Sequence, residues 1–68
     1  MKLLDVVATT VDLPEKRLTR GQVGTIVEEL SSEVVLVEFA DLNGVAYAIT
    51  PVSVSRLMEL NHEPAKAA

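Results

Sequence analysis

The sequence predicts an all-β protein in which five short strands form one small barrel. β-Branched valine recurs in short runs from Val6 to Val54, and such side chains favour pleated strands over helices. Glycine, asparagine, serine and proline separate these runs, as expected of turns between strands. The 68 residues leave room for one domain. We therefore assign residues 1–60 to a single domain and residues 61–68 to a flexible C-terminal tail.

Composition limits both the means of stabilisation and the range of partners. Hydrophobic residues make up 49% of the chain, which has one Phe, one Tyr and no Cys or Trp, so the core must be aliphatic and without disulfides. The net charge of −4 argues against a broad phosphate-binding surface, because such surfaces need clustered Lys and Arg. The chain has neither a membrane-length apolar run nor a signal-peptide pattern, so we expect a cytoplasmic protein.

The N-terminal third predicts one strand followed by a long first loop. Paired valines and paired threonines favour a strand over residues 5–10. The loop covers residues 12–21, where Pro14 cannot donate a hydrogen bond to a neighbouring strand and charged residues indicate exposure. We expect Leu13 and Leu18 to point inward and hold this loop against the barrel.

Two central strands are predicted over residues 22–30 and 33–40, with a polar turn at Ser31–Ser32 between them. Gly21 is expected to adopt a backbone conformation that other residues avoid. Gly24 is expected to mark either a bulge or the close approach of another strand. One face of the second of these strands is assigned to the core because it carries the only phenylalanine; its residues are Val35, Val37 and Phe39.

The C-terminal third predicts a hairpin and a final strand. Asn43–Gly44 indicates a tight turn, because both residues tolerate the positive φ angles of such turns. The next strand covers residues 45–50, with Val45, Tyr47 and Ile49 alternating against alanines. Residues 51–55 form a short link, expected as one 3-10 turn, before the last strand at 56–60. The long first loop, the tight hairpin and the 3-10 turn before the last strand together describe an SH3-like barrel.

Two resemblances support this fold. Residues 21–29, 35–39 and 41–44 resemble the motif of KOW domains, which occur in transcription elongation factors and ribosomal proteins. The wider chain resembles a family of tiny bacterial proteins, common in cyanobacteria and known as a domain of unknown function, at residues 1–7, 12–15 and 47–48. It departs from that family's pattern at residues 9–11 and 50–52. The resemblance implies an SH3-like, KOW-type barrel in a stand-alone cytoplasmic protein, and it carries over no functional residues.

No combination of side chains predicts catalysis. Glu28, Glu29, Glu33 and Glu38 surround one hairpin, where a charged rim that protects strand edges explains them better than an acid–base pair. His62 is the only histidine and lies in the tail without convergent metal ligands. The Gly21-x-x-Gly24 spacing lacks the Lys-Ser/Thr ending of a phosphate loop. We therefore predict a protein that is not an enzyme and has no cofactor, metal or small-molecule substrate.

Protein–protein interaction or assembly is the leading functional interpretation. The outward side of residues 33–40 is more aliphatic than a solvated strand requires, and either another part of the chain or a partner must cover it. The candidate interface residues are Val34, Leu36, Leu42, Val52 and Val54. Self-association is the first form of this hypothesis, and a small subunit bound to another protein is the second.

Weak nucleic-acid binding is the alternative function. A KOW-like module would use the only local basic cluster, formed by Lys16, Arg17 and Arg20 in the long first loop. Three basic residues beside an acidic body support only salt-sensitive binding, and Tyr47 is the one aromatic residue left to stack on a base. A solvated loop, or one that docks on an acidic partner, fits the sequence better. No membrane contact is expected.

Overall fold

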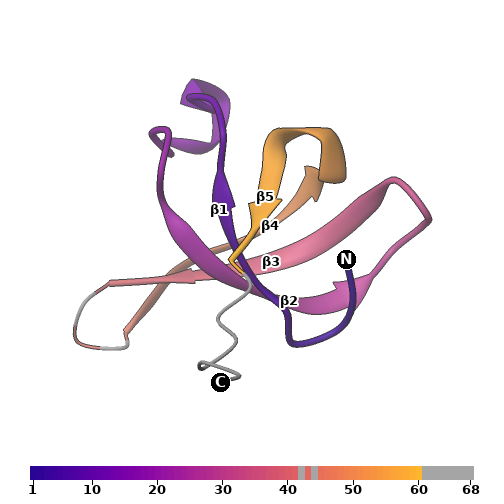
Figure 1. Ribbon diagram of the computed structural model, residues 1–68. Coiled ribbons are helices and arrows are strands. Elements are labelled where there is room, and N and C mark those ends of the chain that lie inside the picture. Colours follow the sequence, from indigo (N-terminus) through magenta and orange to yellow (C-terminus); the bar gives the residue numbers. More distant parts are fainter. Residues whose placement is uncertain (42, 44, 61–68) are drawn as a thin grey trace, which may run out of the picture.

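The computed structural model describes residues 1–41, 43 and 45–60; Leu42, Gly44 and the tail 61–68 with His62 lie outside the described residues. Five strands and two 3-10 turns follow in order: β1 (Val6–Thr9), η1 (Pro14–Lys16), β2 (Val23–Glu29), β3 (Val34–Ala40), β4 (Ala46–Ser53), η2 (Val54–Arg56) and β5 (Leu57–Glu59). Every strand pair is antiparallel, in the order β4-β3-β2-β1-β5 (Figure 1). The predicted all-β fold with five strands is confirmed.

The sheet is bent but not closed, which corrects the expectation of a complete barrel. β4 and β5 are its two edges, and no ladder joins them in the part of the chain that the structure describes. Closure of the sheet into a barrel would require β5 to pair with β4 as well as with β1. Because η2 takes up residues 54–56, β5 is only three residues long, and it pairs with β1 alone.

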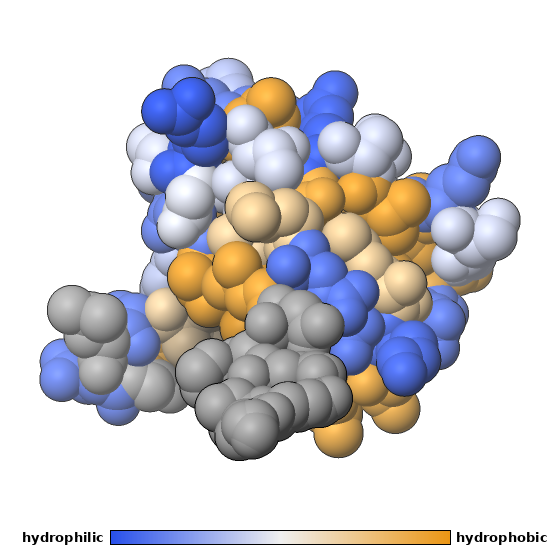
Figure 2. Space-filling model, viewed as in Figure 1, coloured by the Kyte–Doolittle hydropathy of each residue, from blue (hydrophilic) through white to orange (hydrophobic). Residues whose placement is uncertain are grey.

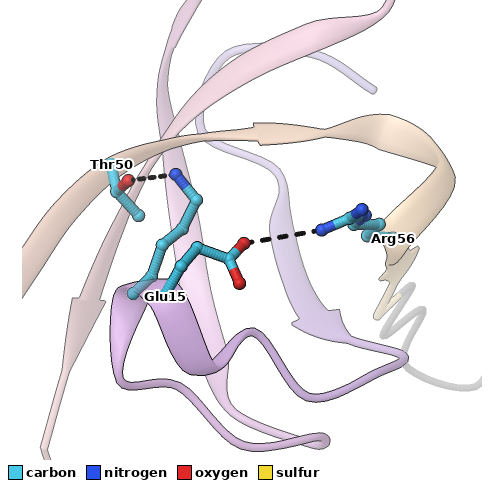
Figure 3. Close-up of polar contacts among 4 residues, drawn as sticks. Glu15, Thr50 and Arg56 are labelled. Carbon is cyan, nitrogen blue, oxygen red and sulfur yellow. Dashed lines mark hydrogen bonds and ion pairs between the residues drawn. The ribbon is translucent and has the colours of Figure 1, made fainter.

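The connection between β1 and β2 spans the opening between the two edges. Leu13 and Leu18 are 1% and 2% exposed and bond to each other through their backbones, so their predicted inward position is confirmed. The Lys16 Nζ donates to the Thr50 Oγ1 of β4 at 2.9 Å (Figure 3). The Arg56 guanidinium of η2 lies 3.6 Å from the Glu15 carboxylate. We call residues 12–20 the strap, because they contact elements on both sides of the opening.

The core lies on the inner face of the sheet, beneath the strap. The predicted inward side of β3 is confirmed, since Val35, Val37 and Phe39 are all buried. The core cluster consists of Val7, Leu13, Leu18, Ile26, Val35, Val37, Phe39, Val52 and Leu57. Thr9 is the buried polar residue among the described ones. Its hydroxyl donates to the Thr19 carbonyl at 2.8 Å and accepts from the Gln22 amide at 3.0 Å, so its burial leaves no polar atom unpaired.

Gly21 and Gly24 have different structural roles. Gly21 has φ +87, the left-handed conformation predicted for it. Gly24 allows a close approach of β3, because a Cβ there would lie 2.6 Å from the Val37 Cγ1. The register shift in β2 lies further on, between Ile26 and Glu28. Both backbone groups of Ile26 bond to the segment before β1, through the Asp5 carbonyl and the Leu4 amide.

Side chains hold the two polar turns. The Ser31 Oγ accepts from the amides of Glu33 and Val34 at 3.1 Å, in the turn predicted at Ser31–Ser32. The Asp41 Oδ1 accepts from the amides of Asn43 and Val45, at 2.8 and 3.0 Å, in the predicted hairpin between β3 and β4. In Figure 1 the end of β3 and the start of β4 extend away from the body of the molecule.

β4 is longer than predicted and continues through Pro51 to Ser53. The 3-10 turn therefore lies at residues 54–56, and the last strand begins at Leu57. The Val54 amide donates to the Glu33 carbonyl, and alternation along the ladder then places Pro51 in a pair that exchanges no backbone hydrogen bonds. The nitrogen of Pro51 consequently faces the free edge of the sheet, where a missing N–H breaks no bond within it.

Candidate functional site: the outer face of the sheet

The side of the sheet opposite the core is largely apolar. Because Val35, Val37 and Phe39 point inward, the residues between and after them point outward. The register places Thr25 and Ile49 on either side of Glu38, and Val6 beyond Thr25. We define the outer face by these outward residues on β1 to β4: Val6, Val23, Thr25, Leu36, Glu38, Ala40, Tyr47 and Ile49.

Large side chains of the outer face remain in solvent. Ile49 is 57% exposed, Val23 48% and Tyr47 47%. On the inner side of the same strands, Ile26 and Val52 are buried, and Ala48 and Thr50 are half-buried. Figure 2 shows hydrophobic surface around β1 and β5 on the side in view, interrupted by hydrophilic residues, with further hydrophilic residues near η1. Exposed apolar residues that lie side by side on neighbouring strands are a feature of interaction surfaces.

A shallow depression lies on the outer face where β2 begins. It is lined by Gly21, Gln22, Val23, Ala40, Asp41 and Tyr47. The Gln22 side-chain amide donates to the Tyr47 hydroxyl and so fixes the aromatic ring at the edge of the depression. The depression is open to solvent, and it is suited to a protruding side chain rather than to an enclosed small molecule.

The charges of the sheet have one sign. The five strands contain Glu28, Glu29, Glu38 and Glu59 but no lysine or arginine. Glu38 is half-buried in the middle of the outer face, and Glu28 lies opposite Leu36. The ion pair found among the described residues joins Glu15 and Arg56, so neither of these glutamates has an ionic partner there.

The structure changes the membership of the predicted interface. Val52 is 2% exposed and belongs to the core, which corrects its assignment to an interface. It pairs with the inward Val35, because residues 51–53 continue β4 instead of forming a link. Val34 and Leu36 are half-buried on the outward side, Val54 packs against the core, and Leu42 lies outside the described residues.

The predicted basic loop is part of the strap. Lys16 is half-buried and bonded to Thr50, whereas Arg17 and Arg20 are exposed. Arg17 has φ +58 and ends η1, and the Arg20 amide donates to the Asp12 carboxylate at 2.8 Å. The strap holds three basic and two acidic residues, so its positive charge is diluted. Its contacts show a structural role for Lys16.

Sequence analysis missed Val23, Ala40 and Ile49 as surface candidates. The available signal was the alternation of large residues with alanine in β4. Ala48 pairs with Phe39, and a small residue opposite the only phenylalanine places the large neighbours on the other side. Without the register, the alternation did not tell which of the two sets faced the core.

Residues 1–41, 43 and 45–60 contain no group of three His, Cys, Asp or Glu side chains arranged to hold a metal ion. No helix within these ranges has the length and hydrophobicity needed to cross a membrane.

Comparison with known proteins identifies a family. Residues 3–59 match a domain of unknown function, DUF4926. The matched segment contains every strand from β1 to β5, together with the strap. No curated protein and no solved structure matches the chain. The chain therefore belongs to the DUF4926 family.

Proposed function

We propose that this protein is a non-catalytic protein-interaction module that binds through the outer face. The observation that carries the proposal is the exposure of Val23 on β2 and of Tyr47 and Ile49 on β4, the two strands that flank β3. Complete burial of one large aliphatic side chain contributes about 1.5–3 kcal/mol, so covering this face would stabilise a complex appreciably. The module acts either in an assembly of its own copies or as a small subunit beside another protein.

The balance of apolar residues supports association. Among the described residues, twelve large hydrophobic side chains are exposed, against ten hydrophobic residues that are buried. A small domain buries a limited fraction of its surface when it folds alone. A partner that binds only the folded chain would also stabilise it.

We further propose that the fold is an SH3-like, KOW-type sheet in which the two edge strands, β4 and β5, do not pair with each other. Three features support this relationship: the strand order β4-β3-β2-β1-β5, the long connection between β1 and β2, and the 3-10 turn directly before β5. The strap closes the core where a complete barrel would use a strand pair.

Photo-cross-linking tests the proposed interaction. A photoreactive amino acid at position 49 should give a discrete covalent adduct in the native cell. The matched control is position 11, because Val11 is also exposed but lies between β1 and the strap, outside the residues that define the outer face. Sedimentation of the purified chain at micromolar concentration then shows whether the adduct contains a second copy. Equal adducts from both positions, or none from position 49, would count against the module.

Weak nucleic-acid binding remains the alternative function and has less support. Arg17 and Arg20 are exposed, but Lys16 is bonded to Thr50 and the strands contain no Lys or Arg. If the alternative holds, the double variant Arg17→Ala/Arg20→Ala should abolish binding of a mixed-sequence RNA oligonucleotide at low salt. Fluorescence anisotropy measures this binding. Its absence in the unmodified chain would exclude the alternative.

A further inference from the structure

We propose that the outer face binds a basic, apolar surface of a different protein, in which a Lys or Arg pairs with Glu38. This inference rests on the proposed function and names the chemistry of the partner. It follows from the position of one carboxylate in an apolar surface and from the distribution of charge over the fold.

Glu38 lies where a docking partner would cover it. Thr25 and Ile49 are directly opposite Glu38 on the neighbouring strands, and Leu36 and Ala40 flank it along β3. Contact with the exposed apolar residues around it would remove the carboxylate from water. A desolvated carboxylate without a partner is strongly unfavourable, whereas a hydrogen-bonded cation offsets much of that cost. No described residue forms an ion pair with Glu38, and a cation on the partner would supply one.

A second copy of this chain does not provide that cation in a two-fold contact. Such a contact sets the same face against itself, and the strands of that face contain glutamate but no lysine or arginine. Like charges would then meet within an apolar interface, which opposes binding. Pairing through the free edge of β4 is also disfavoured, because Pro51 presents a nitrogen without a hydrogen to that edge.

The depression defines the rest of the partner. Val23, Ala40 and Tyr47 form an apolar recess that accepts a protruding aliphatic or aromatic side chain. Asp41 at its margin already accepts two backbone hydrogen bonds and adds further negative charge. A partner that presents apolar residues next to an Arg would satisfy the recess and Glu38 together, and Arg can bond a carboxylate through two parallel N–H groups.

Two designed peptides test the inference on the full-length chain. One is a short amphipathic helix with Leu on one face and Arg on the other; its counterpart carries Glu in place of each Arg. We expect the Arg peptide to bind and to shift the amide resonances of Thr25, Glu38 and Ile49. We expect the Glu peptide to bind at least about tenfold more weakly.

Matched variants separate a specific ion pair from general attraction to an acidic protein. Glu38→Gln should weaken binding of the Arg peptide about tenfold, whereas Glu33→Gln, in the exposed turn, should change it by less than about twofold. Both variants remove one negative charge. Glu38→Lys should reverse the preference and bind the Glu peptide, provided that its amide spectrum shows an intact fold.

Other outcomes would overturn the inference in distinguishable ways. Equal binding of the two peptides, or equal loss from Glu38→Gln and Glu33→Gln, would show that Glu38 does not select the partner. A dimer that forms at micromolar concentration and is abolished by Ile49→Asp would show that a second copy of the chain binds the outer face. The proposed function would then still hold. The chain could instead form oligomers of increasing size. If Arg17→Glu/Arg20→Glu abolishes them, the outer face of one copy contacts the strap of the next, head to tail. No amide shift on the outer face with either peptide, together with no adduct from position 49, would reject the proposed function itself.

Discussion

At the scale of single residues, Gly24 shows most clearly how one position shapes the sheet. Its missing side chain lets β3 come within a distance at which a Cβ would lie 2.9 Å from the Glu38 carbonyl oxygen and 2.6 Å from the Val37 Cγ1. This approach brings β2 and β3 together on the core side of the sheet, where Val37 and Phe39 are buried. The atoms that such a Cβ would meet belong to the Glu38 backbone and to the buried Val37 side chain, and neither can move away freely.

Gly24→Ala should destabilise the fold by about 1–3 kcal/mol, because overpacking in a close-packed interior forces neighbours to shift. Gly21→Ala is the control: nothing lies within 4 Å of its Cβ position, and only its φ of +87 opposes the change. That variant should lose about 1–2 kcal/mol. Urea denaturation followed by circular dichroism measures both. Full stability of Gly24→Ala would show that β2 and β3 can separate without cost.

At the scale of elements, the strap is stabilised by its leucines more than by its charges. Leu13 and Leu18 are buried in the core cluster, whereas the ion pair between Glu15 and Arg56 joins side chains that are 57% and 51% exposed. Water and salt screen such a pair effectively. The strap therefore covers the opening in the fold mainly through its two buried leucines.

Leu18→Ala should lower the free energy of unfolding by about 2–5 kcal/mol, because it removes buried methyl groups and leaves a cavity. Arg56→Ala should lower it by less than about 1 kcal/mol. Thermal unfolding ranks the two variants. Hydrogen exchange at the Leu13 and Leu18 amides, which bond to each other's carbonyls, then tests whether the strap has loosened. If Arg56→Ala proved as damaging as Leu18→Ala, the charges would be the main fastening.

Most elements could be predicted from local patterns. The inward leucines of the strap, the left-handed Gly21 and the inner side of β3 each follow from residue type and spacing within a few positions. The end of β4 could not be predicted, because Pro51 indicates a link unless its nitrogen is known to face a free edge. That single register fact moved Val52 from the surface to the core and shortened β5.

At the scale of the whole molecule, the described apolar residues are divided between a buried core and exposed positions, some of which lie together on the outer face. The core lies between the sheet and the strap, and the outer face has no cover among the described residues. The charged residues of the strands are all glutamate, and the basic residues of the described chain lie in the N-terminal segment, the strap and η2. This distribution of charge supports the proposed preference of the outer face for a cationic partner.

Ile49→Thr and Val52→Ala should separate the two sides of the same strand. Ile49→Thr should change the free energy of unfolding by less than about 0.5 kcal/mol, since the side chain is exposed, and should weaken binding of the Arg peptide. Val52→Ala should lower the free energy of unfolding by about 2 kcal/mol through lost burial and a cavity, and should leave binding unchanged while the chain is folded. Denaturation and fluorescence anisotropy measure these effects. If Ile49→Thr lowered the free energy of unfolding and Val52→Ala weakened binding, Ile49 would face the core and Val52 the partner.

The sequence by itself determined the all-β class, the number of strands, the aliphatic character of the core and the turns, because these depend on residue type and on short spacings. Only the tertiary structure decided that the sheet stays open, that the strap spans the opening and that Glu38 lies within an apolar outer face. The physical reason is that these features depend on register: a shift of one residue moves every side chain of a strand to the opposite side. The register of this sheet is set by the bulge in β2, the close approach at Gly24 and the pairing of β4 through Pro51.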